Sequence, residues 1–308
     1  MIGIKAISSY IPENKVDNIE QALAFSESSE FIINKIGALY LPRMGESEDT
    51  SDIATKAVLN LIRDSELSLD KIDVIAVVTQ NGDGAGLPHT SAIVQSKLGL
   101  KENIAAFDIS LGCSGYVYGL SIVKGLMEQA DLKNGILITA DPYSKIIDRS
   151  DRTTSLLFGD AATATWMGED AIWNLQKPLF STDGIGASNL TIVNNSLSMN
   201  GRQVFNFASK QVPKQIKECL IKNKLDEIEI DLYCIHQGSK AIVEAIAKRF
   251  PNSKEKFISD INETGNTVSS SIPLLLEKKI KDDSLKHILV SGFGVGLSWS
   301  SNIISREV

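Results

Sequence analysis

The chain has 308 residues, of which 43% are hydrophobic, and its formal net charge is −7. This length gives room for about two domains of ordinary size with substantial apolar cores. The acidic balance argues against a nucleic-acid-binding protein, because phosphate contacts require a basic face. No apolar run reaches the roughly 18 residues that a membrane-spanning helix needs, so we expect a cytoplasmic protein without a membrane segment.

Strands and helices are expected to alternate along the chain. Apolar, β-branched runs predict buried strands within 71–82, 135–141, 229–238 and 287–294. Two further short apolar segments, near 107 and 257, each lead into a glycine-containing turn. Helices are expected at 51–63, 88–98, 114–130, 207–224, 239–250 and 267–281. This alternation predicts an α/β fold in which parallel sheets are covered on both faces.

The order of these segments repeats once. KIDVIAVVTQNG at 71–82 matches EIDLYCIHQG at 229–238, and the stretch 107–126 matches 257–280. In the second match, Gly112–Cys113 and Gly265–Asn266 occupy the same place. The repeat predicts two duplicated halves, 1–170 and 171–308, which bring Cys113 and Asn266 to face each other.

Cysteine and histidine are scarce in this chain. The three cysteines are widely spaced, without a C-x-x-C pair or a Cys/His cluster, so we expect reduced thiols and no metal site. They are Cys113, Cys219 and Cys234. Any acid–base chemistry has few histidines to draw on, and these are His89, His236 and His287.

Cys113 lies where a helix is expected to begin. The free amides of a helix N-terminus favour a thiolate, so we expect a lowered pKa and a nucleophilic sulfur. Gly112 and Gly115 permit close approach of the backbone, and the amide of Cys113 can point at a carbonyl oxygen beside the sulfur. From these residues alone, the alternative is a cysteine packed as a small buried hydrophobe.

His236 ends an apolar strand, at the sheet edge where α/β proteins bind ligands, and Asn266 lies in the turn NETGNTV. Taken singly, the histidine is explained as well by a structural hydrogen bond, and the asparagine by the turn itself. Together with Cys113 they form a Cys, His, Asn set at three strand-to-helix junctions. Such a set suits acyl-thioester chemistry, because sulfur carries the acyl group while His and Asn donate hydrogen bonds to an oxyanion.

The whole chain resembles ketosynthases of the thiolase superfamily, in particular 3-oxoacyl-acyl-carrier-protein synthase III. The resemblance is carried by YIPENKVDN, TSDIATKA, DISLGCSGYVYGL, DRTTSLLFGDAATA, STDG, MNGRQVFNFA, IHQG, ETGNT and GFGVGLSW, which occur in the family's order. It implies a five-layered αβαβα fold, a homodimer, and no tightly bound cofactor.

The resemblance also implies roles for the site residues. Cys113 would take an acyl group from an acyl-CoA thioester, and the backbone amides of Cys113 and Val295 would bind the oxyanion of that step. His236 and Asn266 would then stabilise the enolate formed when malonyl-acyl carrier protein loses carbon dioxide. The carbanion would attack the acyl-Cys113 thioester and give a 3-oxoacyl product.

Several expected substrate-binding residues depart from the family's pattern. Phe31 replaces Trp and Lys35 replaces Arg, whereas Arg152 matches a nucleotide-contacting position. The donor is therefore either coenzyme A bound in a different way or an acyl carrier protein, since Lys lacks the bidentate fork of Arg. The other residues expected to bind substrate are Phe205, Gly238 and Ser239, of which Ser239 stands where the family has Asn.

Other departures concern the loops around the pocket. Val295 replaces a glycine of the family's triple-glycine loop, and Leu87 and His89 replace Phe and Ser in a segment that contacts the second subunit. These changes predict a specialised paralogue in fatty-acid or secondary acyl metabolism.

Alternative functions remain open at this stage. An acyltransferase would pass the acyl group from Cys113 to an alcohol or amine without decarboxylation, and an idle member would serve only as an interaction partner. A cysteine hydrolase lacks a family signature here. Lys210, Lys214 and Lys240 either attract an acidic carrier protein or form a solvated helix face.

Overall fold

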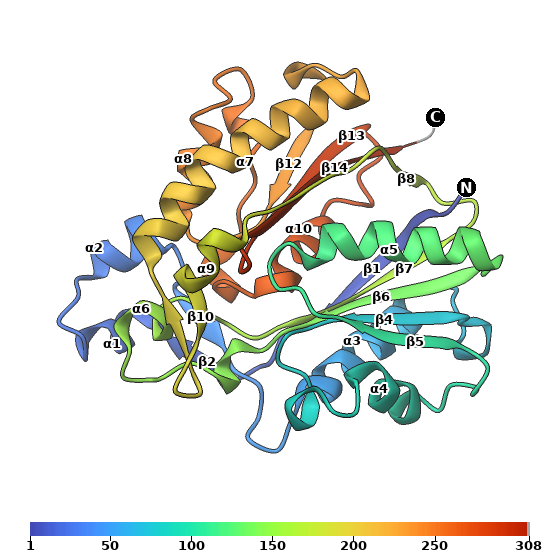
Figure 1. Cartoon of the computed structure of the whole chain (residues 1–308), viewed down its shortest axis with the longest axis horizontal. Coiled ribbons are helices and arrows are strands. Elements are labelled where there is room, and N and C mark those ends of the chain that lie inside the picture. Colours follow the sequence, from blue (N-terminus) through green and yellow to red (C-terminus); the bar gives the residue numbers. More distant parts are fainter. Residues whose placement is uncertain (307–308) are drawn as a thin grey trace.

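The structure is a computed structural model that describes residues 1–306, so residues 307 and 308 of the expected second half lie outside it. Figure 1 shows helices on the outer faces of a large twisted sheet and between its two parts. The strands of this sheet are β1 (Gly3–Tyr10), β4 (Val74–Val78), β5 (Ala105–Ile109), β6 (Asn134–Ala140), β7 (Ala162–Gly168), β8 (Trp173–Leu175), β9 (Leu179–Thr182), β12 (Leu232–Ile235), β13 (His287–Gly294) and β14 (Ser298–Arg306).

Two small ladders lie apart from the large sheet. They pair β2 (Lys15–Asp17) with β3 (Tyr40–Pro42), and β10 (Leu190–Val193) with β11 (Ser196–Met199). The α-helices are α1 (Asn18–Leu23), α2 (Ser29–Phe31), α3 (Thr50–Asp64), α4 (Thr90–Leu98), α5 (Gly115–Ala130), α6 (Arg152–Ser155), α7 (Gly201–Asn223), α8 (Lys240–Ala247), α9 (Ile261–Thr264) and α10 (Ser271–Glu277).

The strand directions follow the same order on both sides of the short β1–β8 pairing. In the first part, β4 is parallel to β5 and β6, and β7 is antiparallel to β6 and β1. In the second part, β12 is parallel to β13, and β14 is antiparallel to β13 and β8. The exact boundary at residue 170 stays a prediction.

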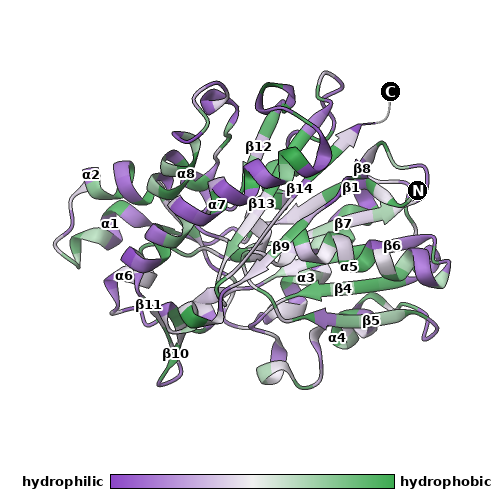
Figure 2. Ribbon diagram, turned by 45° about the horizontal axis from the view of Figure 1, so that its top comes forward, coloured by the Kyte–Doolittle hydropathy of each residue, from purple (hydrophilic) through white to green (hydrophobic). Residues whose placement is uncertain are grey.

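Three hydrophobic clusters join these elements into the five αβαβα layers. α5 and α10 pack between the two parts of the sheet, in a cluster with residues of β4, β12 and β13. α3 and α4 cover the outer face of the first part, and α7 and α8 cover that of the second. Figure 2 accordingly shows mostly hydrophobic or neutral strands at the centre, and helices such as α7 with hydrophilic turns outside.

Strand β4 shows how the sequence produces this layering. All five of its residues are buried, as expected of a parallel strand that is covered on both faces. Val74, Ala76 and Val78 point to the central helices, and Ile75 and Val77 point to the outer ones. This alternation follows from the two-residue period of a strand.

The structure corrects some expected boundaries in the second half. α7 begins at Gly201 rather than at 207, because the Asn200 side chain caps it by accepting a hydrogen bond from the Gln203 N–H. No strand forms at the short apolar segment near 257, where Phe257 makes only an isolated bridge to Tyr233. The helices expected at 239–250 and 267–281 are shorter than expected and end at 247 and 277.

Residues 1–306 have neither a membrane-spanning helix nor a metal-binding cluster. None of the helices there combines the length and apolar character needed to cross a bilayer. Nor do these residues contain a group of three or more His, Cys, Asp or Glu side chains that could hold a metal ion.

A substitution in β13 tests how closely the two parts approach each other. A Cβ on Gly292 would lie 2.6 Å from the carbonyl oxygen of Cys113 and 2.8 Å from the Cα of Ser114, and backbone atoms cannot yield easily. We expect Gly292→Ala to lower the free energy of unfolding by about 1–3 kcal/mol, measured by urea denaturation.

Gly125 provides the matched control, because a Cβ built there meets no atom within 4 Å in the exposed middle of α5. Gly125→Ala should leave stability unchanged or raise it by up to about 1 kcal/mol. Equal effects of the two substitutions would contradict the close approach.

Candidate active site

The three residues expected to be catalytic meet in one pocket, which is lined mainly by apolar side chains. Cys113, His236 and Asn266 all line it, and none of them is more than 4% exposed. They come from three connections that follow β5, β12 and α9. The structure therefore brings together residues that are far apart in the sequence.

Cys113 occupies the turn between β5 and α5, directly before Ser114, the N-cap of α5. A Cβ built on Gly294 would lie 2.7 Å from Cys113 Sγ, so the sulfur needs the space that glycine leaves. The backbone N–H groups of Cys113 and Val295 donate toward Sγ. Two converging backbone amides are a typical arrangement for holding an oxyanion.

The pKa of the Cys113 thiol is raised to about 12, mainly because burial disfavours the thiolate and further because the charge of Asp141 repels it. The amides of Cys113 and Val295 favour the thiolate but do not outweigh burial. The lowered pKa that we expected from a helix N-terminus was wrong, because Cys113 precedes the helix and is almost fully buried. In the free protein, Cys113 is a thiol at neutral pH.

His236 directly follows β12 and is held by contacts on several sides. Its Nδ1 lies 2.8 Å from Ser271 Oγ, and its backbone N–H donates to the carbonyl oxygen of Ser291 at 2.9 Å. The ring of Phe293 stands nearly perpendicular to the imidazole, with 5.3 Å between the centroids. Burial lowers the pKa of His236 to about 3, so the imidazole is neutral at physiological pH.

Asn266 has a fixed side-chain orientation. Its Oδ1 accepts a hydrogen bond from the Val268 N–H at 2.9 Å, whereas its amide nitrogen donates to no group in residues 1–306 and is free to bind a ligand. Its backbone N–H donates to the Leu157 oxygen, and its backbone oxygen accepts from the Gly159 N–H. The preceding Gly265 has a φ of 64°, which favours glycine.

Five of the six residues expected to bind substrate line the same pocket. They are Phe31, Arg152, Phe205, Gly238 and Ser239. The guanidinium of Arg152 lies 5.7 Å from the centre of the Phe31 ring and is ion-paired with Glu27. Ser239 also caps α8, because its Oγ accepts a hydrogen bond from the Ile242 N–H.

Other expected residues lie elsewhere. Lys35 is exposed and does not line the pocket, and Val295 lines an adjoining cavity that shares Leu190 with the pocket. Leu87 and His89 are exposed on the loop before α4, with Leu87 85% exposed. Lys240 donates to the carbonyl oxygen of Ile33.

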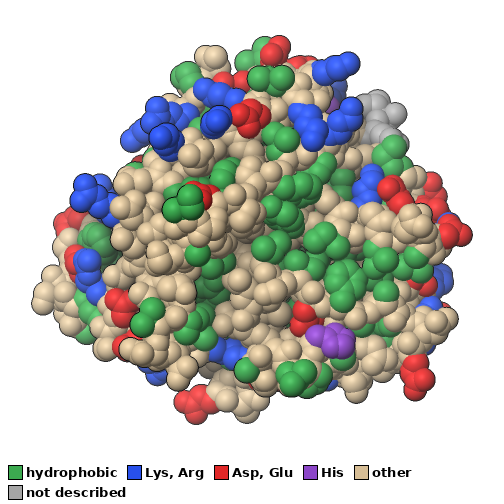
Figure 3. All heavy atoms as spheres, viewed as in Figure 1, with side chains coloured by type: hydrophobic (Ala, Val, Ile, Leu, Met, Phe, Trp, Pro, Cys, Tyr) green, Lys and Arg blue, Asp and Glu red, His purple; other side chains and the backbone are tan. Residues whose placement is uncertain are grey.

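Two of the lysines that we noted in the sequence belong to a basic cluster. Lys210 and Lys214 on α7 line a surface hollow with Lys217 and Arg249. Figure 3 shows lysine and arginine side chains gathered over the upper part of the molecule, where α7 and α8 lie in Figure 1. This surface offers positive charge on a protein whose net charge is negative.

Sequence reasoning missed most of the apolar pocket wall and the partner of His236. The missed wall residues are Ile36, Leu157, Phe158, Leu190, Met199, Val204, Ile242 and Phe293. Five of them lie in stretches that carry the family resemblance, but those stretches do not show which side chains face the pocket: Leu157 and Phe158 in DRTTSLLFGDAATA, Met199 and Val204 in MNGRQVFNFA, and Phe293 in GFGVGLSW. Ser271 lies five residues after Asn266, in a run of three serines that does not reveal which hydroxyl faces the imidazole.

Comparison with known families gives two matches in this chain. Residues 107–184 match the family model of 3-oxoacyl-[acyl-carrier-protein] synthase III, and residues 220–306 match the model of its C-terminal part. A curated β-ketoacyl-[acyl-carrier-protein] synthase III from Lactococcus lactis is 34% identical over 98% of each chain. The chain belongs to the 3-oxoacyl-[acyl-carrier-protein] synthase III family.

Other relatives agree with this membership. The synthase III of Lactobacillus helveticus is 36% identical over 98% of this chain and 97% of its own. The solved synthase III from Thermus thermophilus superposes with a TM-score of 0.90 at 32% identity and covers 99% of both chains. The one from Aquifex aeolicus superposes with a TM-score of 0.92 at 29% identity, over 99% of this chain and 100% of its own.

Membership in the synthase III family confirms the expected thiolase-like fold and shows that the protein is an acyl-transferring condensing enzyme. The comparisons do not favour the alternative, transfer of the acyl group to an alcohol or amine.

The buried imidazole makes a testable contribution to stability. Because the pKa of His236 is about 3 in the folded protein and near 6.5 when exposed, the unfolded chain binds a proton that the folded chain does not. The contribution of the neutral imidazole to the free energy of unfolding is therefore fully present above pH 6.5 and decreases as the pH falls toward 3. Between pH 8 and 5 it should fall by about 2 kcal/mol.

Urea denaturation of the wild type and of His236→Asn at several pH values tests this contribution. The variant should lose less stability on acidification than the wild type. An identical pH dependence of the two proteins would contradict a neutral, buried His236.

Proposed function

We propose that the protein transfers an acyl group from a thioester to Cys113 and condenses it with malonyl-acyl carrier protein, releasing carbon dioxide and a 3-oxoacyl product. One observation carries this proposal: a buried thiol, a neutral imidazole and a free side-chain amide line one apolar pocket. Such a pocket suits a reaction in which negative charge develops twice on a carbonyl oxygen.

In the first half-reaction, Cys113 Sγ attacks the thioester carbonyl. The sulfur–carbon bond forms as the carrier thiol leaves, and the proton of Cys113 ends on that thiol. The amides of Cys113 and Val295 donate to the oxyanion of the tetrahedral intermediate. Their direction toward Sγ supports this role. Once acylated, the sulfur needs no charge, so the apolar surroundings favour the acyl-enzyme.

In the second half-reaction, His236 and Asn266 donate hydrogen bonds to the enolate oxygen. The free amide of Asn266 supports its role as a donor. For His236 to donate to the enolate, its ring proton must sit on Nε2, with Nδ1 accepting from the Ser271 hydroxyl; that hydroxyl, 2.8 Å from Nδ1, donates to the Val268 carbonyl oxygen at 3.0 Å in the free protein and has to turn to the imidazole. A neutral imidazole is a donor that keeps its proton, so the enolate carbon remains free to attack the acyl group.

We infer that the donor is a thioester of coenzyme A or of an acyl carrier protein. The apolar wall suits the linear arm and acyl chain of either donor. Phe31 and Arg152 at the pocket offer an aromatic face and a cation, but Glu27 already pairs with this arginine. This pairing, together with the substitutions at 31, 35 and 239, supports a specialised donor.

We further propose that the enzyme acts as a homodimer. β5 lies at the end of the strand order, with its outer edge unpaired in the described chain, and the apolar Leu87 is exposed nearby. An open strand edge pairs readily with a second copy.

Acyl transfer to Cys113 is tested by mass spectrometry with a panel of acyl-CoA and acyl-carrier-protein thioesters. We expect a mass gain on the Cys113 peptide that disappears, with a 3-oxoacyl product, when malonyl-acyl carrier protein is added. Cys113→Ala should prevent the gain. Cys219→Ala is the matched control and should retain it, because Cys219 is buried in α7 and does not line the pocket.

The same assay separates the two half-reactions. His236→Ala and Asn266→Ala should still form the acyl-enzyme but condense about 10²–10³-fold more slowly, because each removes one enolate donor. An adduct that persists with malonyl-acyl carrier protein would point to another acceptor. No adduct from any donor would refute Cys113 as the nucleophile for these donors.

The basic cluster on α7 and Arg249 suits docking of an acidic carrier protein. Charge reversal in Lys210→Glu/Lys214→Glu should raise the KM for malonyl-acyl carrier protein about tenfold at low salt, with kcat little changed. Steady-state kinetics at several salt concentrations measure this effect.

The matched control for the cluster is Lys71→Glu. This lysine precedes β4, at the amino end of a strand whose carboxyl end lies on the side of the pocket. The control should leave the KM unchanged. A rise in KM of about threefold in the control, which is half of the tenfold effect on a logarithmic scale for half of the charge change, would show that only the net charge matters.

A further inference from the structure

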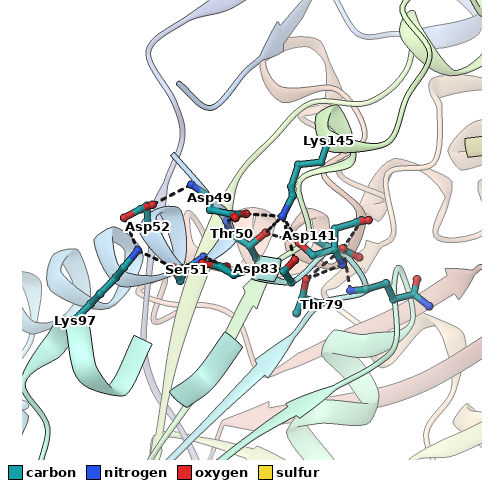
Figure 4. Close-up of polar contacts among 12 residues, drawn as sticks. Asp49, Thr50, Ser51, Asp52, Thr79, Asp83, Lys97, Asp141 and Lys145 are labelled. Atoms are coloured by element: carbon teal, nitrogen blue, oxygen red, sulfur yellow. Dashed lines mark hydrogen bonds and ion pairs between the residues drawn. The ribbon is translucent and has the colours of Figure 1, made fainter. Parts of the chain in front are cut away.

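Asp141 follows β6 and is a buried carboxylate without a cationic partner. It is 1% exposed. Its Oδ1 accepts hydrogen bonds from the Gln80 N–H at 3.0 Å and from the Asn81 side-chain amide at 2.8 Å, with Thr79 Oγ1 at 3.5 Å. Its Oδ2 is buried and has no hydrogen-bond partner in the described residues. Figure 4 shows this carboxylate at one end of a polar network.

The cation nearest in this network is occupied elsewhere. Lys145 Nζ donates to the carbonyl oxygens of Asn81 and Gly82 at 3.0 and 3.1 Å and is ion-paired with Asp49. Figure 4 shows Lys145 reaching toward Asp49 and Thr50. Lys145 thus holds the loop that carries the donors to Asp141, but it makes no ion pair with Asp141 itself.

Two other buried acids lie beside Asp141, because Tyr143 follows it by two residues and packs against Cys113 in one buried cluster. Burial and the charge of Asp141 raise the pKa of each. The Tyr143 hydroxyl donates to Gln80 Oε1 at 3.5 Å. Both side-chain oxygens lie close to the backbone of Gly112, which directly precedes the nucleophile. A Cβ built on Gly112 would lie 2.8 Å from Gln80 Oε1 and 3.4 Å from the Tyr143 hydroxyl oxygen.

We propose that Asp141 is a positioning residue that sets the protonation state of Cys113, because this buried cluster of three acids carries no more than one negative charge at a time. While Asp141 is ionised, the thiol keeps its proton. When Asp141 is protonated, the thiolate forms at a lower pH. The inference rests on the proposed role of Cys113 as the nucleophile and concerns how that role is controlled.

The chemistry of the cluster supports this coupling. Two like charges in one dry site repel each other strongly, so the second ionisation is suppressed. Burial raises the pKa of Asp141 to about 7, although the hydrogen bonds from Gln80 and Asn81 act to lower it. Its charge therefore changes in the neutral range, where an ordinary aspartate is already ionised.

The test measures the rate at which iodoacetamide alkylates Cys113 as a function of pH, followed by peptide mapping. In Asp141→Asn, the same Oδ1 acceptor remains but the charge is gone. We expect alkylation to be about tenfold faster than in the wild type at pH 8–9, where Asp141 is ionised. Below pH 6 the two rates should converge.

Asp160→Asn is the matched control, because Asp160 is also fully buried and accepts backbone N–H groups from Met44 and Ser144. Its alkylation profile should follow that of the wild type. A profile for Asp141→Asn that equals the wild-type profile would overturn the proposal. So would a rate that is lower by the same factor at every pH, because that result indicates only a structural role.

A second variant keeps the test valid if Asp141→Asn does not fold. Asn81→Leu removes a donor to the carboxylate and leaves Asp141 in place, so Asp141 should keep its proton to higher pH and alkylation near pH 7–8 should become faster. No change in this range would also contradict the proposal. Alkylation reports on the thiol alone, so its outcome is distinguishable from a failure of acyl loading or condensation in the thioester assay.

Discussion

The contact between the Cys113 turn and β13 is the constraint on which the rest of the site depends. Gly292 and Gly294 let the backbone of β13 lie directly against the turn, without side chains between them. Ser114 reinforces the contact through its hydroxyl, which lies 2.9 Å from that of Ser298 on β14. Through this contact the first part of the chain supplies the sulfur, and the second supplies the Val295 amide that points to it.

Burial is the common cause of the electrostatics at this site. It raises the pKa of Cys113, lowers that of His236 and raises that of Asp141, so each group tends toward its neutral form. A site of neutral groups suits a reaction whose charges appear only as intermediates form. Backbone amides and the Asn266 side chain then provide dipoles that need no proton transfer to act.

Much of the fold and the central residues of the site could be predicted from the sequence. The repeat placed Cys113 and Asn266 at equivalent turns, because a duplicated strand–turn–helix unit carries its geometry with it. Local patterns could not reveal the charge state of Cys113, since the burial that sets its pKa comes from segments far along the chain, such as the Gly294 loop. Ser271 was missed for the same reason, because its distance to His236 depends on how α10 packs between the two parts of the sheet.

The pocket wall has a consequence for how such a protein diversifies. Asn266 is tied through its backbone to Leu157 and Gly159, so its position depends on main-chain hydrogen bonds rather than on neighbouring side chains. Met199, Val204 and Ile242, in contrast, enter the pocket from β11, α7 and α8, each an element without a catalytic residue. Substitutions at these three positions can alter the size of the cavity while the catalytic side chains keep their positions. New acyl chains can therefore be accepted in evolution without any change in the residues that carry out the reaction.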